Sequence, residues 1–252
     1  MTLELLKSRH SVRSFSTDPI PAELRNALNA QITMINSHES GLNFQIIYDN
    51  EDPFKGFSRS YGFFKNTRNY LACVIDPTFP HTEERAGFFA EQFVMKAVEL
   101  GLGTCFIGGT FSASHVAAQM HVYEKLPFIV AFGFSLEEKT SALAKLAMKI
   151  AHRKTMAARE FFDGDAKTYK EATDKYPWLP NALEAVACAP SSLNKRPVRI
   201  TLSDSGELCA RSLPADSKSA IDLGIAKFNF AAVAPGEWEW GEKAPFIVED
   251  QV

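Results

Sequence analysis

The chain has little net charge of either sign. Its 252 residues contain 27 Lys and Arg against 30 Asp and Glu, a formal net charge of −3. A protein that binds nucleic acid or an anionic membrane through its overall charge is markedly basic, so this balance argues against both partners. Hydrophobic residues make up 46% and charged residues 23% of the chain. These shares exclude a disordered, collagen-like or coiled-coil protein.

Cysteine is scarce and widely spaced. The four cysteines are Cys73, Cys105, Cys188 and Cys209. Because no two of them form a C-x-x-C pair, the spacing argues against a zinc knuckle, a redox dithiol or a disulfide scaffold. We expect four reduced, mostly buried thiols. His115 and His121 lack neighbouring carboxylates, so we also expect no metal site.

Long apolar runs are missing as well. No stretch approaches the roughly 20 apolar residues that cross a bilayer. The first residues, MTLELLKSRHSVRSF, contain no apolar run of roughly 7–15 residues of the kind found in a signal peptide. We therefore expect a cytoplasmic protein without a membrane partner.

Hydrophobic periodicity predicts a mixture of helices and strands, and the length allows one large domain or two small ones. Helices are expected just after Thr2 and at 21–37, 85–100, 113–120, 182–187 and 219–233. Strands are expected at 43–48, 70–75, 126–134, 198–202, 207–212 and 245–249, and the stretch 141–168 is expected to be a surface connection. A helix followed by small residues and then aromatic residues occurs twice, as FFAEQFVMKAVEL-GLGTCF and IDLGIAKFNFAAV-APGEWEW. Either chance or an internal duplication explains this repeated pattern.

Three segments carry candidate chemistry, and each has a plainer alternative. Residues 9–13 (RHSVR) place two guanidiniums, an imidazole and a hydroxyl together, which suits a phosphate or a polyol but also a solvated charge cluster. Residues 188–194 (CAPSSLN) offer hydroxyls and an amide to a flat heterocycle, or simply end a helix. Residues 101–109 (GLGTCFIGG) allow a ligand to approach the backbone closely, but they match neither a dinucleotide fingerprint nor a P-loop.

Taken together, these segments resemble the FMN-dependent nitroreductase family. Residues 9–15 (RHSVRSF) resemble its R-x-S-x-R-x-F opening, and residues 189–197 (APSSLNKRP) resemble its A-P-S-x-x-N-x-Q-P loop. Residues 99–108 (ELGLGTCFIG) are similar to its G-L-G-(S/T)-x-W-I-G segment, and residues 152–154 (HRK) to its late basic clamp. The resemblance covers nearly the whole chain. It implies an α+β nitroreductase fold, with central mixed or antiparallel sheets flanked by helices.

The order of the motifs departs from the family. Ordinary members carry the Pro-Ser-Asn loop a few dozen residues after the arginines, whereas residues 36–43 lack it here and the loop lies at 189–194. Family members are homodimers whose flavin sites combine the arginines of one subunit with the loop of the other. The chain therefore resembles a subgroup with two fused halves, 1–165 on the FMN phosphate side and 166–252 with the flavin-ring loop, interlocked as an intrachain pseudo-dimer. Such a chain could work as a monomer, and further association stays open.

The resemblance implies one FMN per chain. The arginines and the basic clamp would hold the phosphate, His10 and Ser11 would contact the phosphate or ribityl chain, and the two remaining segments would line the ring. The implied cofactor-binding residues are Arg9, His10, Ser11, Arg13, Ile107, Gly108, Gly109, Arg153, Lys154, Pro190, Ser191, Ser192 and Asn194. Because FMN carries the chemistry, no catalytic acid or base is nominated.

The implied activity is that of an FMN-dependent NAD(P)H oxidoreductase. Hydride would pass from NADH or NADPH to flavin N5 and then to a nitroaromatic, quinone or similar acceptor, by a ping-pong mechanism. Two alternatives stay open: a flavin-binding or flavin-consuming protein without NAD(P)H turnover, and a binding module that kept the fold without the flavin. Aromatic residues in 54–64 are candidate substrate contacts or core residues. Arg196 replaces the family's Gln and Phe106 its Trp, so the substrate preference does not carry over.

Overall fold

The computed structural model describes residues 1–55, 64–136 and 156–249, and the chain divides into two compact units. The sheet unit comprises Arg9–Thr82 and Gln92–Met148, and the hairpin unit comprises Met1–Ser8, Glu83–Glu91 and Lys149–Val252. The units are interleaved along the sequence, whereas we expected the consecutive halves 1–165 and 166–252. One physical reason is that helix α1 (Leu3–Ser8) packs in the hairpin unit, where Lys7 forms an ion pair with Glu184 at 3.0 Å.

The sheet unit is built on four antiparallel strands. In spatial order they are β1 (Leu42–Ile47), β2 (Tyr70–Ile75), β4 (Ile129–Gly133) and β3 (Gly103–Ile107). Every residue of the two middle strands is buried, the pattern of strands that are covered on both faces. The α+β fold class predicted from the sequence is confirmed, with all four strands antiparallel.

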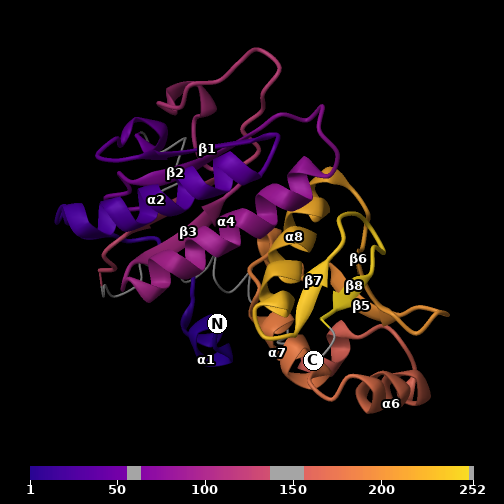
Figure 1. Cartoon of the computed structure of the whole chain (residues 1–252). Coiled ribbons are helices and arrows are strands. Elements are labelled where there is room, and N and C mark those ends of the chain that lie inside the picture. The colour runs from indigo at the N-terminus through magenta and orange to yellow at the C-terminus, as the bar shows by residue number, and fades with distance from the viewer. Residues whose placement is uncertain (56–63, 137–155, 250–252) are drawn as a thin grey trace. The chain divides into compact units, whose positions relative to one another are not determined.

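Helices cover one face of this sheet (Figure 1). Helix α2 (Ala22–His38) is tied to β1, because the Asn36 side chain donates to the carbonyl of Phe44 at 2.8 Å and accepts its N–H at 2.9 Å. The second half of helix α4 (Thr82–Glu99) packs Phe93 edge-on against Phe132 of β4, with ring centroids 5.4 Å apart. Both helices were predicted within a few residues.

The opposite face of the sheet carries a second layer made of the N-terminal segment and short turns. Val12 and Phe15 are buried there with Cys105 and Ile107 of β3. The 3-10 turn η1 (Asp52–Phe54) adds the ring of Phe54, which lies 5.8 Å from Tyr70 and 6.1 Å from Phe64. Phe54 is therefore a core residue, the plainer of its two interpretations. Residues 56–63 of the aromatic segment lie outside the described residues.

The helix expected at 113–120 is wrong. The structure has only a 3-10 turn, η2 (Ala113–His115), and residues 116–121 are not helical. Val116 and Ala118 both pack against the core, which is the two-residue period of an extended chain. The backbone is held by side chains instead of helical hydrogen bonds, because Gln45 accepts the N–H of Gln119 at 2.9 Å and donates to its carbonyl at 2.6 Å.

The hairpin unit contains two antiparallel strand pairs and several helices. The pairs are β5 (Val198–Leu202) with β6 (Leu208–Ser212), and β7 (Gly236–Trp238) with β8 (Phe246–Val248). Besides α1, the helices and turns are η3 (Ala158–Phe161), α6 (Ala166–Lys175), α7 (Leu179–Cys188), η4 (Ser192–Asn194) and α8 (Ser217–Ala231). Phe230, Trp238 and Phe246 form the centre of its core, with ring centroids 4.9–5.0 Å apart.

The sequence analysis missed α6, β3 and β7. Helix α6 lies in the stretch expected to be a connection, and it begins where Asp165 accepts the N–H of Thr168 at 2.8 Å. Such a carboxylate cap satisfies one of the free N–H groups of the first helical turn. Strand β3 coincides with the glycine-rich segment, whose glycines concealed the strand pattern.

The same topology occurs twice along the chain. The first repeat runs α2-β1-β2-α4-β3-β4, and the second runs α7-β5-β6-α8-β7-β8. The first forms a sheet in the order β1-β2-β4-β3. In the second, an antiparallel bridge between Cys209 and Pro245 places β8 beside β6, so the order β5-β6-β8-β7 is equivalent. An identical strand order on both stretches favours internal duplication over chance.

Helices α4 and α8 meet through two glycines inside the hairpin unit. A Cβ on Gly87 would lie 2.1 Å from the carbonyl oxygen of Ile221, and a Cβ on Gly224 would lie 1.8 Å from that of Glu84. Each glycine thus contacts the residue three positions before the other, which is the reciprocity of an interface with two-fold symmetry. Only glycine permits this approach, and the contact brings the first half of α4 into the hairpin unit.

Candidate functional site

The cationic segment at residues 9–13 lies along the edge of strand β3. Ser11 forms a parallel bridge with Thr104, and the N–H of Val12 donates to the carbonyl of Thr104 at 2.9 Å. Side chains alternate along extended backbone, so Arg9, Ser11 and Arg13 share the side opposite buried Val12. Arg9 and Ser11 are half-buried, and His10 and Arg13 are exposed.

The thiol of Cys105 on β3 is influenced by these side chains. Burial raises the pKa of the Cys105 thiol, whereas the charges of Arg13 and Arg9 and a hydrogen bond from Ser11 act to lower it. Two guanidiniums and a hydroxyl on one short extended segment suit an anionic group such as a phosphate.

Two glycines follow directly at the end of β3. The side chain of Ile107 is buried in the core, so only its backbone is available to a ligand. A Cβ on Gly108 or Gly109 would meet no atom within 4 Å, and neither residue has the positive φ that demands glycine. The packing of the described residues thus gives no reason for glycine at either position. Open space beside the backbone fits the close approach of a flat ligand.

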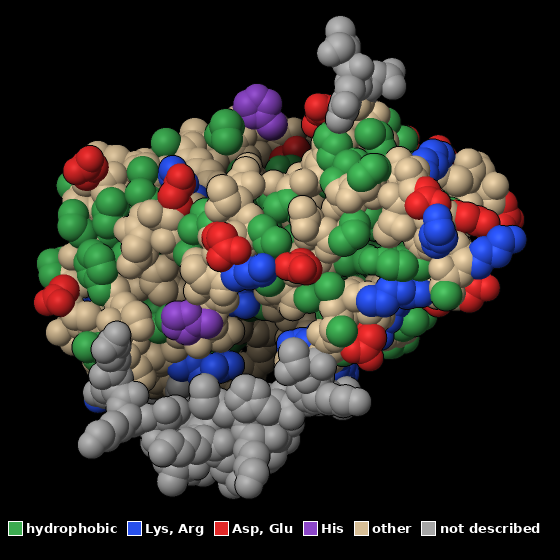
Figure 2. Space-filling view, turned by 90° about the horizontal axis from the view of Figure 1, so that it is seen from below, with side chains coloured by type: hydrophobic (Ala, Val, Ile, Leu, Met, Phe, Trp, Pro, Cys, Tyr) green, Lys and Arg blue, Asp and Glu red, His purple; other side chains and the backbone are tan. Residues whose placement is uncertain are grey.

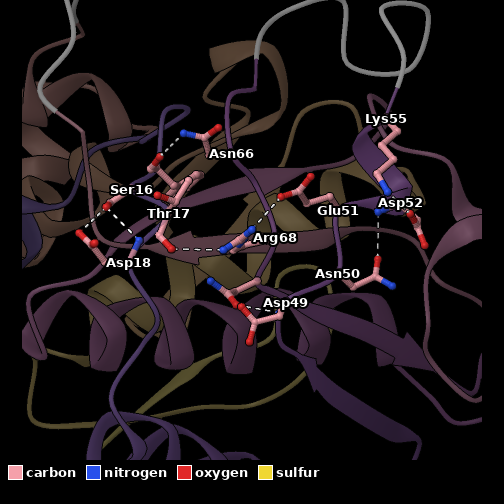
Figure 3. A network of polar contacts seen from close by, with 12 residues as sticks. Ser16, Thr17, Asp18, Asp49, Asn50, Glu51, Asp52, Lys55, Asn66 and Arg68 are labelled. Carbon is pink, nitrogen blue, oxygen red and sulfur yellow. Dashed lines mark hydrogen bonds and ion pairs between the residues drawn. The ribbon is translucent and has the colours of Figure 1, made fainter.

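A polar network fixes the chain that follows the cationic segment (Figure 3). Asn66 donates to the carbonyl of Phe15 at 3.0 Å, and the N–H of Phe15 donates to the carbonyl of Lys65 at 3.1 Å. The Arg68 guanidinium donates to the carbonyl of Thr17 at 3.2 Å and to Glu51 at 3.0 Å, as the dashed lines in Figure 3 show. These contacts fix the backbone of Phe15 and Thr17, which follow the cationic segment.

The Pro-Ser-Ser-Leu-Asn loop lies in the hairpin unit, between α7 and β5. Leu193, Asn194 and Arg196 have φ values of +51°, +53° and +51°, the left-handed region that is unfavourable for residues with a Cβ. Within the loop, the Ser191 hydroxyl accepts the N–H of Arg196 at 2.9 Å and Asn194 Oδ1 accepts from Arg196 Nε at 3.1 Å. Leu193 is 76% exposed, although it is large and apolar. The loop therefore combines an unfavourable backbone conformation with an exposed apolar side chain.

Asp222 is a residue of this site that the sequence analysis did not find. It lies on α8, it is 6% exposed, and its two oxygens accept the N–H of Ser192 at 3.0 and 3.2 Å. Burial raises the pKa of Asp222 to about 6, opposed by the hydrogen bond from Ser192 and the charge of Lys195. The available signal was a carboxylate within the apolar sequence AIDLGIAKFNF of the predicted helix.

The same helix buries a second charge. Lys227 is fully buried and forms an ion pair with Glu84, and it also donates to the carbonyls of Glu239 at 2.9 Å and Gly241 at 3.0 Å. The other oxygen of Glu84 accepts the N–H of Gly241 at 2.8 Å. Burial lowers the pKa of Lys227, and Glu84 opposes this change. Because all its donors are used inside the unit, this pair holds α4, α8 and the β7–β8 connection together.

Some predictions about the site fall outside the described residues. Arg153 and Lys154, the expected basic clamp, belong to the undescribed stretch 137–155. Within the part of the chain that the structure covers, no group of three His, Cys, Asp or Glu side chains could hold a metal ion. The helices described there include none that is long and apolar enough to cross a membrane. On the face in view in Figure 2, acidic and basic side chains are interspersed, in agreement with the small net charge.

These features define an α+β protein of the nitroreductase fold. Comparison with family models gives the family: the model described as "Putative TM nitroreductase" matches residues 1–234, and the chain belongs to this family. A solved structure of a "putative nitroreductase" from Thermotoga maritima is 21% identical, covers 98% of this chain and 92% of its own, and superposes with a TM-score of 0.61. At this identity the likeness establishes the fold.

Two further solved structures cover a smaller share of the chain. An FMN-dependent nitroreductase from Clostridium difficile is 21% identical and covers 62% of this chain and 100% of its own, with a TM-score of 0.44. A nitroreductase with bound FMN from Bacteroides fragilis is 18% identical and covers 55% and 93%, with a TM-score of 0.42. Among curated proteins, no sequence matches the chain.

Proposed function

We propose that the chain is an FMN-dependent oxidoreductase that takes hydride from NADH or NADPH and reduces a nitroaromatic, quinone or similar acceptor by a ping-pong mechanism. Membership of a nitroreductase family supports the oxidoreductase role. The observation that carries the proposal is the cationic segment on β3, followed at the end of the strand by two glycines with open space beside them.

The donors present fit the phosphate of FMN. Arg9 and Arg13 would hold it through charge-assisted hydrogen bonds, which are strong and directional for a guanidinium with a phosphate. Ser11, between them on the same side of the backbone, would donate a hydroxyl to the phosphate or the ribityl chain, and exposed His10 would add a ring nitrogen. We extend the proposal to Arg153 and Lys154, as the resemblance implies.

The remaining proposed contacts concern the flavin ring. The backbone of Ile107, Gly108 and Gly109 would approach it on one side. Pro190, Ser191, Ser192 and Asn194 would supply small, polar contacts on the other. FMN, when bound, supplies a ring that accepts hydride from nicotinamide and delivers it to the acceptor. The chain's own residues then have to bind, orient and exclude water, so we assign no catalytic acid or base.

The proposal includes one flavin per chain. The cationic segment precedes the first repeat, and the Pro-Ser-Asn loop belongs to the second, so each set occurs once in the chain. A chain with a single set of each can complete one site of this composition.

An anaerobic titration tests the function. We expect the purified chain to carry a flavin spectrum, and NADH or NADPH to bleach it without oxygen; adding a nitroaromatic or a quinone should restore the colour. A flavin spectrum that neither nucleotide bleaches would favour a flavin-binding protein without NAD(P)H turnover. A chain that does not bind FMN at all would contradict the proposal.

Two variants assign the phosphate contacts. Arg9→Ala with Arg13→Ala should weaken FMN binding by about 100-fold, since each removes a hydrogen bond to a charged group. Lys167→Ala is the matched control, because Lys167 is exposed on α6 and pairs only with Glu171 at 3.7 Å among the contacts described. Riboflavin, which has no phosphate, should bind to the double variant and to the wild type with similar affinity. Equal FMN affinity of the double variant and the control would refute the phosphate assignment.

A further inference from the structure

The Pro-Ser-Asn loop holds a backbone conformation that its own residues disfavour. Three of the four residues from Leu193 to Arg196 have φ near +50°, and none of them is glycine. Such residues persist where the surroundings fix them, and they cluster at binding sites. The hydrogen bonds between Ser191, Asn194 and Arg196 are internal to the loop, so they shape it without placing it on the fold.

A contact with Asp222 ties the start of the loop to helix α8. Both carboxylate oxygens accept the same N–H, that of Ser192, the first residue of η4. Asp222 sits on α8, whose start is fixed by Asp216 accepting the N–H of Ser219 at 2.8 Å. The bond therefore connects a capped, packed helix to the residue directly before the left-handed turn.

Asp222 occupies a costly position for a purely structural acceptor. It lines a cavity of about 10 Å³ together with Pro190, Ser191 and Arg196, among apolar residues of α7 and η3. The charges that act on it are Lys195, which favours its carboxylate, and Asp216, which disfavours it. Burial raises its pKa to about 6, so ionisation of this carboxyl group costs more in the folded chain than in water. A neutral Asn would accept the same N–H without this cost, and a buried charged group beside a loop is a candidate for a functional role.

We propose that Asp222 is a positioning residue for flavin binding: through the N–H of Ser192 its carboxylate holds the Pro-Ser-Asn loop in the conformation that contacts the flavin ring. The inference rests on the proposed function, because it concerns the same site. It adds a regulatory consequence. The charged carboxylate makes the stronger bond, so flavin affinity falls when Asp222 becomes protonated.

The test uses two matched pairs of variants and measures FMN affinity by quenching of flavin fluorescence. Ser192→Pro removes the N–H and Ser192→Ala keeps it. Proline suits the first residue of a 3-10 turn, and Ser191 before it has the extended φ and ψ of −146° and 156° that proline requires. Asp222→Ala removes the acceptor, and Asp222→Asn keeps an uncharged one. We expect Asp222→Ala to weaken binding about tenfold relative to the wild type, and Ser192→Pro to weaken it about tenfold relative to Ser192→Ala, which lacks the hydroxyl but keeps the N–H. Tenfold is the expected effect of losing a hydrogen bond to a charged group.

The pH dependence separates positioning from simple packing. The FMN phosphate itself titrates near pH 6, so the informative quantity is the ratio of the dissociation constants of Asp222→Asn and the wild type. This ratio should be largest at about pH 8 and approach one at about pH 5, where Asp222 is protonated. A ratio independent of pH, or unchanged affinity in Ser192→Pro and Asp222→Ala, would overturn the inference while leaving the function intact. A wild type that fails to bind FMN would overturn both.

Discussion

The two repeats of this chain have one topology and different contents. The strands β1–β4 of the first have five or six residues each, whereas β7 and β8 of the second have three. The charged groups next to the first repeat, Arg9 and Arg13, lie at the edge of a strand and are at least partly exposed. Helix α8 of the second repeat buries two charged residues, Lys227 and Asp222, and α4 of the first repeat buries Glu84, the partner of Lys227.

The comparison separates features of the backbone from features of the side chains. Strand order and the reciprocal contact of Gly87 with Gly224 are equivalent in the two repeats, since both depend on backbone geometry. The polar side chains are not equivalent: the cations accompany one repeat and the strained loop belongs to the other. Under the proposed function, these two sets of side chains would serve one flavin.

The largest effect is expected from the buried ion pair between Lys227 of α8 and Glu84 of α4. Lys227→Met should lower the free energy of unfolding by about 4 kcal/mol, because it leaves the buried carboxylate of Glu84 without its cation. Urea unfolding measures this change. Combining it with Glu84→Gln should recover part of the loss, since the double variant buries no charge. A single variant within about 1 kcal/mol of the wild type would show that the pair is not needed for the fold.

The helix contact shared by the repeats should be almost as sensitive. Gly224→Ala places a Cβ where the carbonyl oxygen of Glu84 lies 1.8 Å away, so α4 and α8 must separate. We expect a loss of about 3 kcal/mol in thermal or urea unfolding, typical of overpacking. Gly87→Ala should cost a similar amount, because the contact is reciprocal. Clearly different losses of unfolding free energy in the two variants would show that the two glycines are not equivalent.

Asp222→Asn should raise the free energy of unfolding, in contrast to the three substitutions above. An acid with a raised pKa stabilises the fold fully below its unfolded value of 3.8 and loses this contribution as the pH rises through about 6. The difference between the two values sets an upper bound of about 3 kcal/mol. A buried amide keeps part of the desolvation cost, so we expect a gain of about 2 kcal/mol at about pH 8 that disappears near pH 4. A variant less stable than the wild type at about pH 8 would show that the charge is compensated.

Gly108→Ala should produce the smallest effect, and on binding rather than on stability. A Cβ there meets no protein atom, so the unfolding free energy should change by less than about 0.5 kcal/mol. If flavin approaches this backbone, FMN binding should weaken by about 1 kcal/mol, the low end of an overpacking cost. Unchanged FMN affinity would show that the flavin ring does not approach the backbone at the end of β3.

Much of the scaffold followed from the sequence, because apolar periodicity determines it. Strand 70–75 was predicted with its observed bounds, and α2, α4 and α8 within three residues at each end. Prediction failed where side-chain contacts distant in sequence decide the backbone. At 113–120, Val116 and Ala118 allow a helix or an extended chain, and the hydrogen bonds of Gln45 select the extended one.

The motifs of the candidate site could be predicted from the sequence, whereas the contacts that hold them in place could not. The arginines and the Pro-Ser-Asn loop stand out in the sequence as local residue types. The position of Ser11 opposite Thr104 depends on pairing over more than ninety residues, and Asp222 reaches Ser192 across thirty. The left-handed φ of Leu193 has no signal in the residue type, because leucine ordinarily avoids that region.

The number of flavins bound per chain tests the central claim most directly, because the account holds that two equivalent scaffolds share one set of site residues. Titration of the flavin-free chain with FMN, followed by calorimetry, gives this number together with the affinity. The account predicts one FMN per chain. Two FMN per chain would contradict it, because each repeat would then hold a complete site. A chain that binds no FMN would contradict it as well.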